Sequence, residues 1–189
     1  MIGGIEGLHL QNSKKRRLVQ SAFEWADALV FAVVIVVLLF TFLFRTIAVE
    51  GSSMVPTLLN GDRMIVSHLF YQPQPGDIVV IIRPENDTTA IIKRIIAVEG
   101  QTVDIDFDAG SVMVDGQVLE ETYINEPTNM KRDVGFPVTV PEGCVFVMGD
   151  NRNHSLDSRD SSIGMVDQRY ILGKAVFRFF PFHKIGLIE

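Results

Sequence analysis

The chain has 189 residues and a formal net charge of −6 at pH 7, which allows one soluble domain with a sizeable core plus an appendage. Residues 46–189 carry twelve Lys or Arg against twenty Asp or Glu, without a basic cluster, and this excludes a typical nucleic-acid-binding domain. The single cysteine, Cys144, excludes an intrachain disulfide and a multi-cysteine zinc site.

A long apolar segment lies near the N-terminus. Residues 28–44 read ALVFAVVIVVLLFTFLF, in which Thr41 is the single polar residue. As a helix rising ~1.5 Å per residue, this segment reaches roughly 25 Å, and Trp25 and Ala26 extend it toward the thickness of a bilayer. A buried core helix is the alternative, but soluble helices are rarely apolar on every face. We therefore predict a transmembrane signal-anchor helix over residues 22–45.

The charges that flank this segment predict its orientation. The run KKRR at 14–17 precedes it, whereas Arg45 stands alone on the other side. The positive-inside rule then predicts a cytoplasmic tail over residues 1–21 and an extracytoplasmic domain in a single-pass protein of the plasma membrane. A cleavable signal peptide is the alternative, but its apolar core is shorter, at ~7–15 residues, and the sequence FRTIAVEGSS offers no good Ala-x-Ala site.

After the apolar segment, short runs of strand-forming residues alternate with turn signals. The clearest runs are MIVSHLF, DIVVII, AIIKRIIAV, TVDIDF, CVFVM and AVFRFF. The stretch MVDGQV predicts a two-residue hairpin, because Asp-Gly suits a type I′ turn. No long helical period follows residue 45. The expected class is mostly β, with an antiparallel and partly barrel-like domain.

One acidic stretch resembles a calcium-binding loop. Asp104, Asp106 and Asp108 alternate, but Ala109 stands where such a loop needs Gly, and Asp115 replaces the bidentate Glu. Apolar residues separate these carboxylates, as in a half-buried strand. We therefore expect a strand here, and no metal site.

Two adjacent serines occur in VEGSSMVPTL, residues 49–58, where they belong either to a linker or to a site with a serine nucleophile. A serine nucleophile needs a base, which is most often His. The chain contains no Gly-x-Ser-x-Gly, His-Glu-x-x-His or Ser-x-x-Lys motif. Of its four histidines, His9 falls in the predicted cytoplasmic tail, and His68 lies in a strand-like run that favours a structural role.

The unusual candidate for the base is Lys93, in AIIKRIIAV. A period of two places it on one strand face with Ile91 and Ile95. Such a lysine is either a gatekeeper at a sheet edge or a desolvated amine. A free lysine has a pKa of ~10.4, and burial lowers it by up to ~3–5 units, which would give a competent general base.

A third polar cluster is GDNRNHSLDSRD, at 149–160. It follows a strongly apolar strand. Two interpretations remain open: a solvated loop with an ion pair between Asp157 and Arg159, or a rigid hydrogen-bonded shell around a site.

Together these segments resemble one family. The segments GSSMVPTLLNGD (51–62), IIKRIIAVEGQTV (91–103) and GDNRNHSLDSRD (149–160) occur in the order, and at about the separations, seen in type I signal peptidases of bacteria. GKAVFRFFPFHKIG (173–186) resembles the family's closing strand. The single predicted anchor resembles the shorter form found in Gram-positive bacteria.

The resemblance implies a fold and an activity. The fold is a catalytic β core, expected here over 46–103 and 142–189, with a small β insertion over 104–141. The activity is that of a membrane-anchored serine endopeptidase that uses a Ser-Lys dyad and no cofactor. Such enzymes remove signal peptides from exported preproteins after an Ala-x-Ala-like motif, so the implied partners are preproteins and the lipid bilayer.

The resemblance also implies roles for individual residues. Ser53 matches the nucleophile and Lys93 the general base, while Ser155 matches a hydroxyl that orients the lysine amine. The supporting residues are Asp150, Asp157 and Arg159. The residues expected to bind substrate are Ile47, Val49, Gly51, Ser52, Met54, Ala90, Ile91 and Ile92. Some relatives carry an oxyanion-stabilising Ser where this chain has Gly51, so the second donor stays open.

Two other function classes remain as alternatives. A self-cleaving repressor would share the Ser-Lys core, but the predicted anchor and the lack of a DNA-binding helix pair argue against it. A non-catalytic, membrane-anchored β domain would keep the fold, but the joint presence of Ser53, Lys93 and Ser155 argues against that.

Overall fold

A computed structural model describes residues 23–38, 44–82 and 90–188. The chain divides into two units, residues 1–43 and 44–189, each of which is described by itself. In the first unit, residues 23–38 form a helix whose apolar side chains are exposed. Among the described residues, no helix combines the length and apolar character needed to cross a membrane. The expected tail, residues 1–21, and part of the expected anchor, residues 22 and 39–43, lie outside the described residues.

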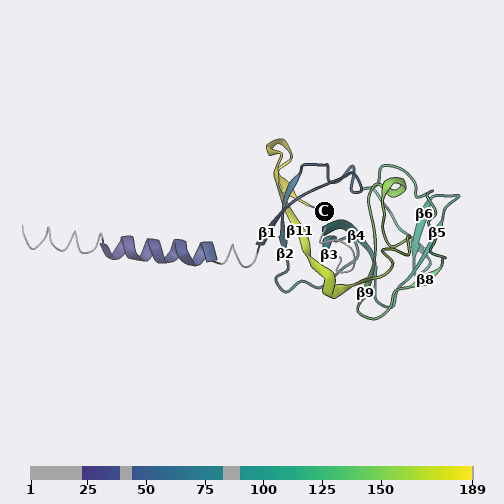
Figure 1. The fold of residues 1–189 in the computed structure, drawn as a ribbon, viewed down its shortest axis with the longest axis horizontal. Helices are drawn as coiled ribbons and strands as arrows, with labels where there is room; N and C mark the ends of the chain where they lie inside the picture. The colour runs from purple at the N-terminus through teal and green to yellow at the C-terminus, as the bar shows by residue number, and fades with distance from the viewer. Residues whose placement is uncertain (1–22, 39–43, 83–89, 189) are drawn as a thin grey trace, which may run out of the picture. The chain divides into compact units, whose positions relative to one another are not determined.

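The second unit contains a main sheet of eight strands, all paired antiparallel (Figure 1). In spatial order they are β1 (Phe44–Ala48), β2 (Arg63–Ser67), β11 (Ile171–Phe180), β3 (Ile78–Ile82), β4 (Ala90–Val98), β9 (Cys144–Met148) and β10 (Val166–Asp167), with β12 (Gly186–Leu187) also pairing with β11. The mostly β, antiparallel class is confirmed. Within the described part of the chain β1 and β10 do not pair, so the sheet is open and the partly barrel-like arrangement is not supported.

Burial on both faces explains the apolar run of β3. Its sequence IVVII is buried at the first four positions. Ile78 and Val80 pack into a cluster with Met54 and Leu58 on one face, whereas Val79 packs into a second cluster on the other. A strand covered on both faces reads as a continuous apolar run rather than an alternating one.

A second, smaller sheet has the order β7-β6-β5-β8. Its strands are β5 (Thr102–Asp106), β6 (Ser111–Val114), β7 (Gln117–Val118) and β8 (Val138–Thr139). The expected hairpin joins β6 to β7, where Asp115 and Gly116 both have positive φ, as a type I′ turn requires. Buried residues of this sheet pack with β4 and β9 in one cluster, so the two sheets share a core. The division into a core and an insertion over 104–141 stays a prediction.

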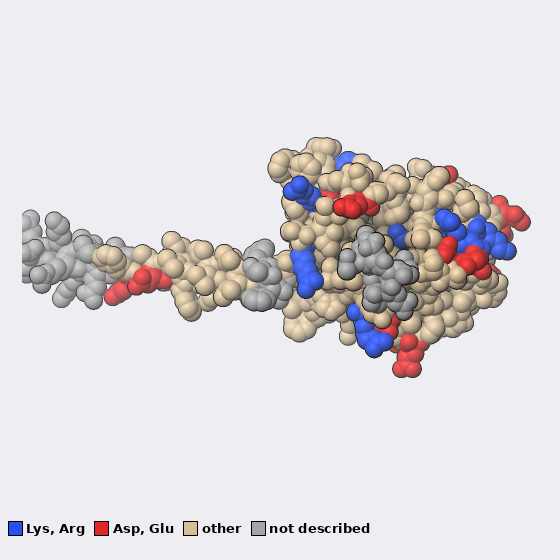
Figure 2. All heavy atoms as spheres, in the orientation of Figure 1, with Lys and Arg blue, Asp and Glu red and all other residues tan. Residues whose placement is uncertain are grey.

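Short 3₁₀ helices complete the fold: η1 (Arg152–His154), η2 (Gln168–Tyr170) and η3 (Phe182–Lys184). In the stretch that resembles a calcium loop, the Asp106 carboxylate accepts hydrogen bonds from the amides of Asp108 and Ala109, so it closes a turn at the end of β5. On the face of the second unit shown in Figure 2, Lys and Arg side chains are interspersed with Asp and Glu.

Candidate active site

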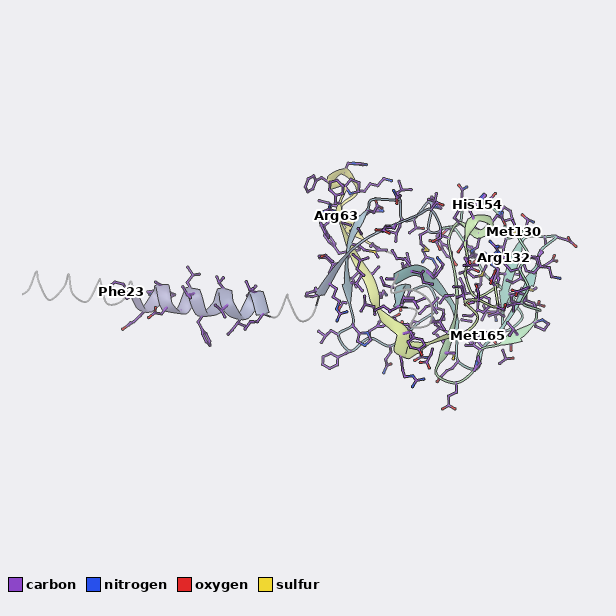
Figure 3. The ribbon with its side chains drawn as sticks, viewed as in Figure 1. Phe23, Arg63, Met130, Arg132, His154 and Met165 are labelled. Atoms are coloured by element: carbon purple, nitrogen blue, oxygen red, sulfur yellow. The ribbon has the colours of Figure 1, made fainter. Side chains whose placement is uncertain are left out.

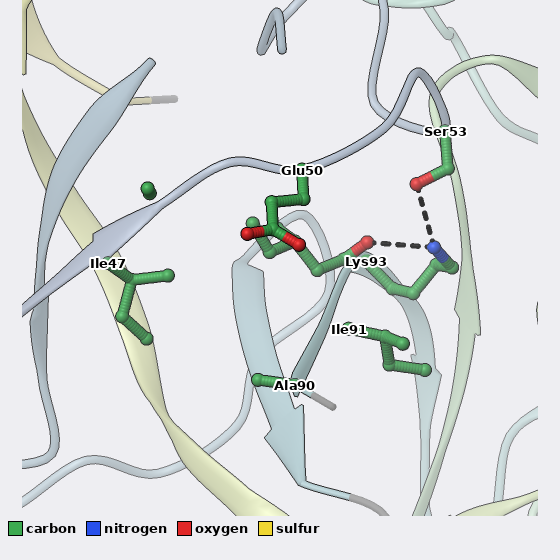
Figure 4. Close-up of a pocket in the computed structure, with 8 residues that line it drawn as sticks. Ile47, Glu50, Ser53, Ala90, Ile91 and Lys93 are labelled. Carbon is green, nitrogen blue, oxygen red and sulfur yellow. Dashed lines mark hydrogen bonds between the residues drawn. The ribbon is translucent and has the colours of Figure 1, made fainter. Parts of the chain in front are cut away.

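Ser53 and Lys93 meet at the edge of a pocket (Figure 4). Ser53 lies in the turn that follows β1, and Lys93 comes from β4. The Lys93 Nζ donates hydrogen bonds of 2.9 Å to Ser53 Oγ and of 2.9 Å to the carbonyl oxygen of Ile92. The amine and the hydroxyl are therefore within reach for a direct proton transfer.

Burial makes this lysine unusual. Lys93 is 4% exposed, and desolvation lowers its pKa from 10.5 to about 8, although the charges of Asp157 and Asp150 oppose the shift. A pKa near the working pH gives a substantial fraction of neutral amine, which is the form that accepts a proton. Of the two interpretations left open by the sequence, the structure supports the desolvated amine.

The 149–160 loop holds the serine turn by its backbone. The Asn151 amide donates to the carbonyl of Ser53 at 3.0 Å, and its side-chain Nδ2 donates to the carbonyl of Ser52 at 3.0 Å. A side chain at Gly149 would overlap both the Ser53 carbonyl and the Ser155 side chain, so only glycine fits there. The polar cluster is thus a packed element of the site, rather than a solvated loop.

Asp157 and Arg159 form a fully buried ion pair, with Arg159 Nε and Nη2 each 2.8 Å from a carboxylate oxygen of Asp157. The same carboxylate accepts a bond from the Gly149 amide at 3.0 Å. The Oγ of Ser155 is buried, and within the described residues it makes no hydrogen bond to the Lys93 amine. Its role in orienting the Lys93 amine therefore stays a prediction.

Asp150 pairs with a residue that the sequence reasoning did not single out. Arg94 donates to the two carboxylate oxygens of Asp150 through Nε and Nη2, both at 2.9 Å, and Thr57 donates to the same carboxylate at 2.5 Å. A signal for Arg94 was available, because the run IIKRII places a second basic residue on a strand that is otherwise apolar. A buried guanidinium requires an acidic partner.

The segment between β7 and β8 of the small sheet, which contains Met130 and Arg132, lies against the same loop (Figure 3). The Asn153 side-chain oxygen accepts bonds from the amides of Asn129 and Met130, and Arg132 Nη2 donates to the carbonyl of Ser155 at 3.1 Å. The small sheet is thus connected to the site by direct hydrogen bonds.

A pocket of about 350 Å³ adjoins the Ser53–Lys93 pair. Four of the expected substrate-binding residues line it, namely Ile47, Ala90, Ile91 and Ile92. Ala48 and Glu50 also line it, and the sequence reasoning missed both.

The other expected substrate-binding residues do not line this pocket. Val49 and Met54 are 3% and 2% exposed and belong to the core cluster. Gly51 and Ser52 lie in the turn before Ser53, where the Gly51 amide donates to Asn60 Oδ1 at 2.9 Å. These four residues support the serine turn rather than the pocket wall.

Two strand edges border the pocket. Among the described strands, β1 pairs only with β2, and residues 90–93 of β4 pair only with β3. Within the described residues, Ile47 and Ala48 of β1 and Ala90 and Ile91 of β4 therefore lie along edges that no other strand pairs. An extended peptide lying in the pocket would find main-chain partners there, as in β-strand addition.

Known proteins resemble this chain in sequence. The family described as "Signal peptidase, peptidase S26" matches residues 22–180. The chain is 39% identical to signal peptidase I of Bacillus licheniformis over an alignment covering 87% of this chain and 92% of that protein. It is 42% identical to the probable signal peptidase I-1 of Synechocystis sp., with 94% and 92% covered.

Among solved structures, a signal peptidase I from Enterococcus faecalis V583 is 30% identical, with 55% of this chain and 97% of that chain covered and a TM-score of 0.44. The sequence relatives alone confirm the resemblance drawn from the four motifs. This chain belongs to the signal peptidase family, peptidase S26.

Proposed function

We propose that this chain is a membrane-anchored serine endopeptidase that removes N-terminal signal peptides from exported preproteins, cutting after an Ala-x-Ala-like motif. The observation that carries the proposal is the 2.9 Å contact between Lys93 Nζ and Ser53 Oγ, beside a pocket lined by residues of β1 and β4. Membership of the peptidase S26 family supports the same reaction.

In the proposed mechanism, neutral Lys93 takes the hydroxyl proton of Ser53 while Ser53 Oγ attacks the scissile carbonyl. The tetrahedral intermediate collapses as Lys93 gives this proton to the departing amine, which leaves an acyl-enzyme on Ser53. Water then attacks the ester with Lys93 again as the base, and Ser53 regains its proton. The desolvated lysine thus does the work of the histidine in a conventional triad.

The developing oxyanion needs preorganised donors. The amide of Ser53 is the first, because it makes no hydrogen bond within the described part of the chain. Gly51 has no hydroxyl, and its amide is engaged by Asn60. The hydroxyl of Ser52 is the remaining side-chain candidate in this turn for a second donor.

The pocket suits apolar side chains on the substrate. It has a volume of about 350 Å³, and the apolar side chains of Ile47, Ile91 and Ile92 line it together with the Ser53–Lys93 pair. Pairing of the substrate backbone with β1 and β4 fixes the register without reading most side chains. This combination is consistent with a protease that accepts many preproteins sharing one small-residue motif.

The proposal places the N-terminus in the cytoplasm and the catalytic domain outside the plasma membrane. Its support is the apolar segment at 28–44, the basic run at 14–17 and the exposed apolar side chains of the described helix. The domain consists of a catalytic core over 46–103 and 142–189 and a small insertion over 104–141. Because a preprotein is itself held by its apolar segment, anchoring both partners raises their effective concentration.

The test is mass spectrometry of the products when the full chain, purified in detergent, meets a preprotein with an Ala-x-Ala site. We expect one cut directly after the motif. Ser53→Ala removes the nucleophile and should abolish the cut, whereas Ser111→Ala, on β6, should retain it. Turnover by a folded Ser53→Ala protein, free of wild-type contamination, would refute the assignment of Ser53.

A further inference from the structure

We propose that Glu121 and Tyr123, which follow β7 in the expected insertion, are positioning residues for the lysine base. Their side chains, here called the clasp, hold two buried arginines, Arg94 directly after Lys93 and Arg152 in the loop that holds the serine turn. This inference rests on the proposed function and adds a role for the small-sheet region in the reaction.

The clasp contacts Arg94, the residue directly after the proposed base. The guanidinium carbon of Arg94 lies 3.9 Å from the centre of the Tyr123 ring. Its nitrogens also bind the Asp150 carboxylate and the carbonyl of Gly76. A desolvated cation over an aromatic face is strongly attracted to it. Tyr123 therefore helps to fix Arg94, and with it the adjacent backbone of Lys93.

The clasp also contacts Arg152, in the loop that holds the serine turn. Arg152 is fully buried, and its Nη1 and Nη2 lie 2.8 and 2.5 Å from the two carboxylate oxygens of Glu121. Its Nε donates to the carbonyl of Gly149 at 3.0 Å, and Gly149 packs against the backbone of Ser53. Glu121 therefore acts on the nucleophile's side of the pair.

The two halves of the clasp are joined to each other. The Tyr123 hydroxyl donates to Glu121 Oε1 at 3.1 Å. Desolvation and the Glu121 charge raise the pKa of Tyr123 to about 12, so the phenol keeps its proton over the working range of pH. One continuous path of contacts therefore runs from Arg94 through the clasp to Arg152.

This path of contacts affects the distance between Ser53 Oγ and Lys93 Nζ, on which proton transfer depends. The backbone of β4 has a partner apart from the clasp, since Arg94 pairs in register with Met148 of β9. Proton transfer asks for more, because a misplacement of about 1 Å costs up to about a hundredfold in rate. Loss of the clasp should also loosen the Arg94–Asp150 pair, so that the Asp150 charge, which opposes the lowering of the Lys93 pKa by desolvation, acts more strongly and raises that pKa.

The experiment compares four variants of the full chain in detergent, using the same preprotein as substrate. Tyr123→Leu removes the ring and Glu121→Gln removes the charge. We expect kcat to fall about tenfold with KM within about twofold of wild type, and the midpoint of the pH–rate profile to move to higher pH. Tyr123→Phe keeps the ring and should restore most of the rate. The exposed neighbour provides the matched control, Glu120→Gln, which should behave as wild type.

Wild-type kcat and an unmoved midpoint in Tyr123→Leu and Glu121→Gln would overturn the proposal, even if both variants melt at lower temperature. If Glu121→Gln fails to fold, the comparison of Tyr123→Leu with Tyr123→Phe decides. If the wild-type protein cuts no preprotein, the proposed function fails instead. The clasp is then judged by an NMR titration of the Lys93 amine in wild type and Tyr123→Leu, where equal pKa values would refute it.

Discussion

The second unit contains lysines and Asp–Arg pairs in two settings, buried close to the pocket and exposed to solvent. Lys93 on β4 and Lys174 on β11 both pair in register with Val79, so they occupy the same level on either side of β3. Lys93 is 4% exposed and bonds a hydroxyl and a carbonyl, whereas Lys174 has 38% of its side chain exposed and pairs with Asp77 at 2.5 Å. Burial without a directly paired carboxylate, rather than position in the sheet, prepares a lysine to act as a base.

Two ion pairs repeat the contrast. Asp157–Arg159 and Asp167–Arg169 have the same sequence spacing, and both are close contacts, at 2.8 and 2.6 Å. The first pair is fully buried, whereas the Arg169 side chain is 84% exposed. Equal geometry in different solvent should give unequal energies, because water screens the exposed pair.

The largest expected effect comes from exchanging the lysines for an uncharged side chain of similar length. Lys93→Met should lower the cleavage rate by about a thousandfold or more, since it removes the base. Lys174→Met should stay within about threefold of wild type. Initial rates of preprotein cleavage at pH 8 measure both. An equal loss of cleavage rate in the two variants would mean that removing any lysine at this level of the sheet lowers the rate, and that the buried amine has no special role.

The pH dependence sharpens the same contrast. Because the neutral form of Lys93 is the base and its pKa is about 8, kcat/KM should rise about tenfold per pH unit below that value and level off above it. Lys174→Met should leave the midpoint unchanged. A profile that is flat from pH 5 to 10 would exclude a lysine base for the wild-type enzyme.

The two ion pairs should separate clearly in stability. Asp157→Asn leaves Arg159 buried without its counter-charge, which should cost about 3–5 kcal/mol of unfolding free energy. Asp167→Asn should have a much smaller effect, since the Arg169 side chain is solvated and Asn can still accept the bond from the Arg169 amide. Chemical denaturation of the two variants in the same detergent makes the comparison. Similar losses for the two substitutions would mean that burial does not set the strength of these pairs.

Lys93→Met should also stabilise the fold, against the direction of its effect on rate. Below pH 8 both the folded and the unfolded chain carry a protonated Lys93, so the folded state bears the full cost of a buried ammonium, about 1–3 kcal/mol. Between pH 8 and 10.5 only the unfolded chain binds the proton, and this cost disappears as pH rises. The gain should therefore be largest below pH 8. Lys174→Met, which removes the ion pair with Asp77, should show no gain.

The sequence predicted the parts of the site that local patterns encode. Alternating and continuous apolar runs indicated the strands, and the motifs around Ser53 and Lys93 indicated the pair that the structure brings together. Contacts between segments that are distant in the sequence could not be predicted from local patterns. The partner of Arg94 is 56 positions away in sequence, and β11 inserts between β2 and β3 without any local signal. The burial of Val49 also depends on tertiary packing, because a period of two alone does not tell a core face from a pocket face.

The smallest expected effect concerns Glu50, which is exposed to solvent like Arg169. It differs from Arg169 because it lines the pocket that also contains Ser53 (Figure 4). Its carboxylate should favour a substrate with Lys over one with Glu at a position close to the scissile bond. Exposed charge pairs are weak, so Glu50→Gln should reduce that preference by about two- to fivefold. To measure this preference, Lys or Glu is placed in turn at each substrate position close to the scissile bond, and the cleavage rates of the resulting preproteins are compared at low salt. Glu142→Gln, exposed in the turn before β9, is the matched control. A wild-type preference that survives unchanged in Glu50→Gln, or that high salt does not weaken, would place its origin outside this carboxylate.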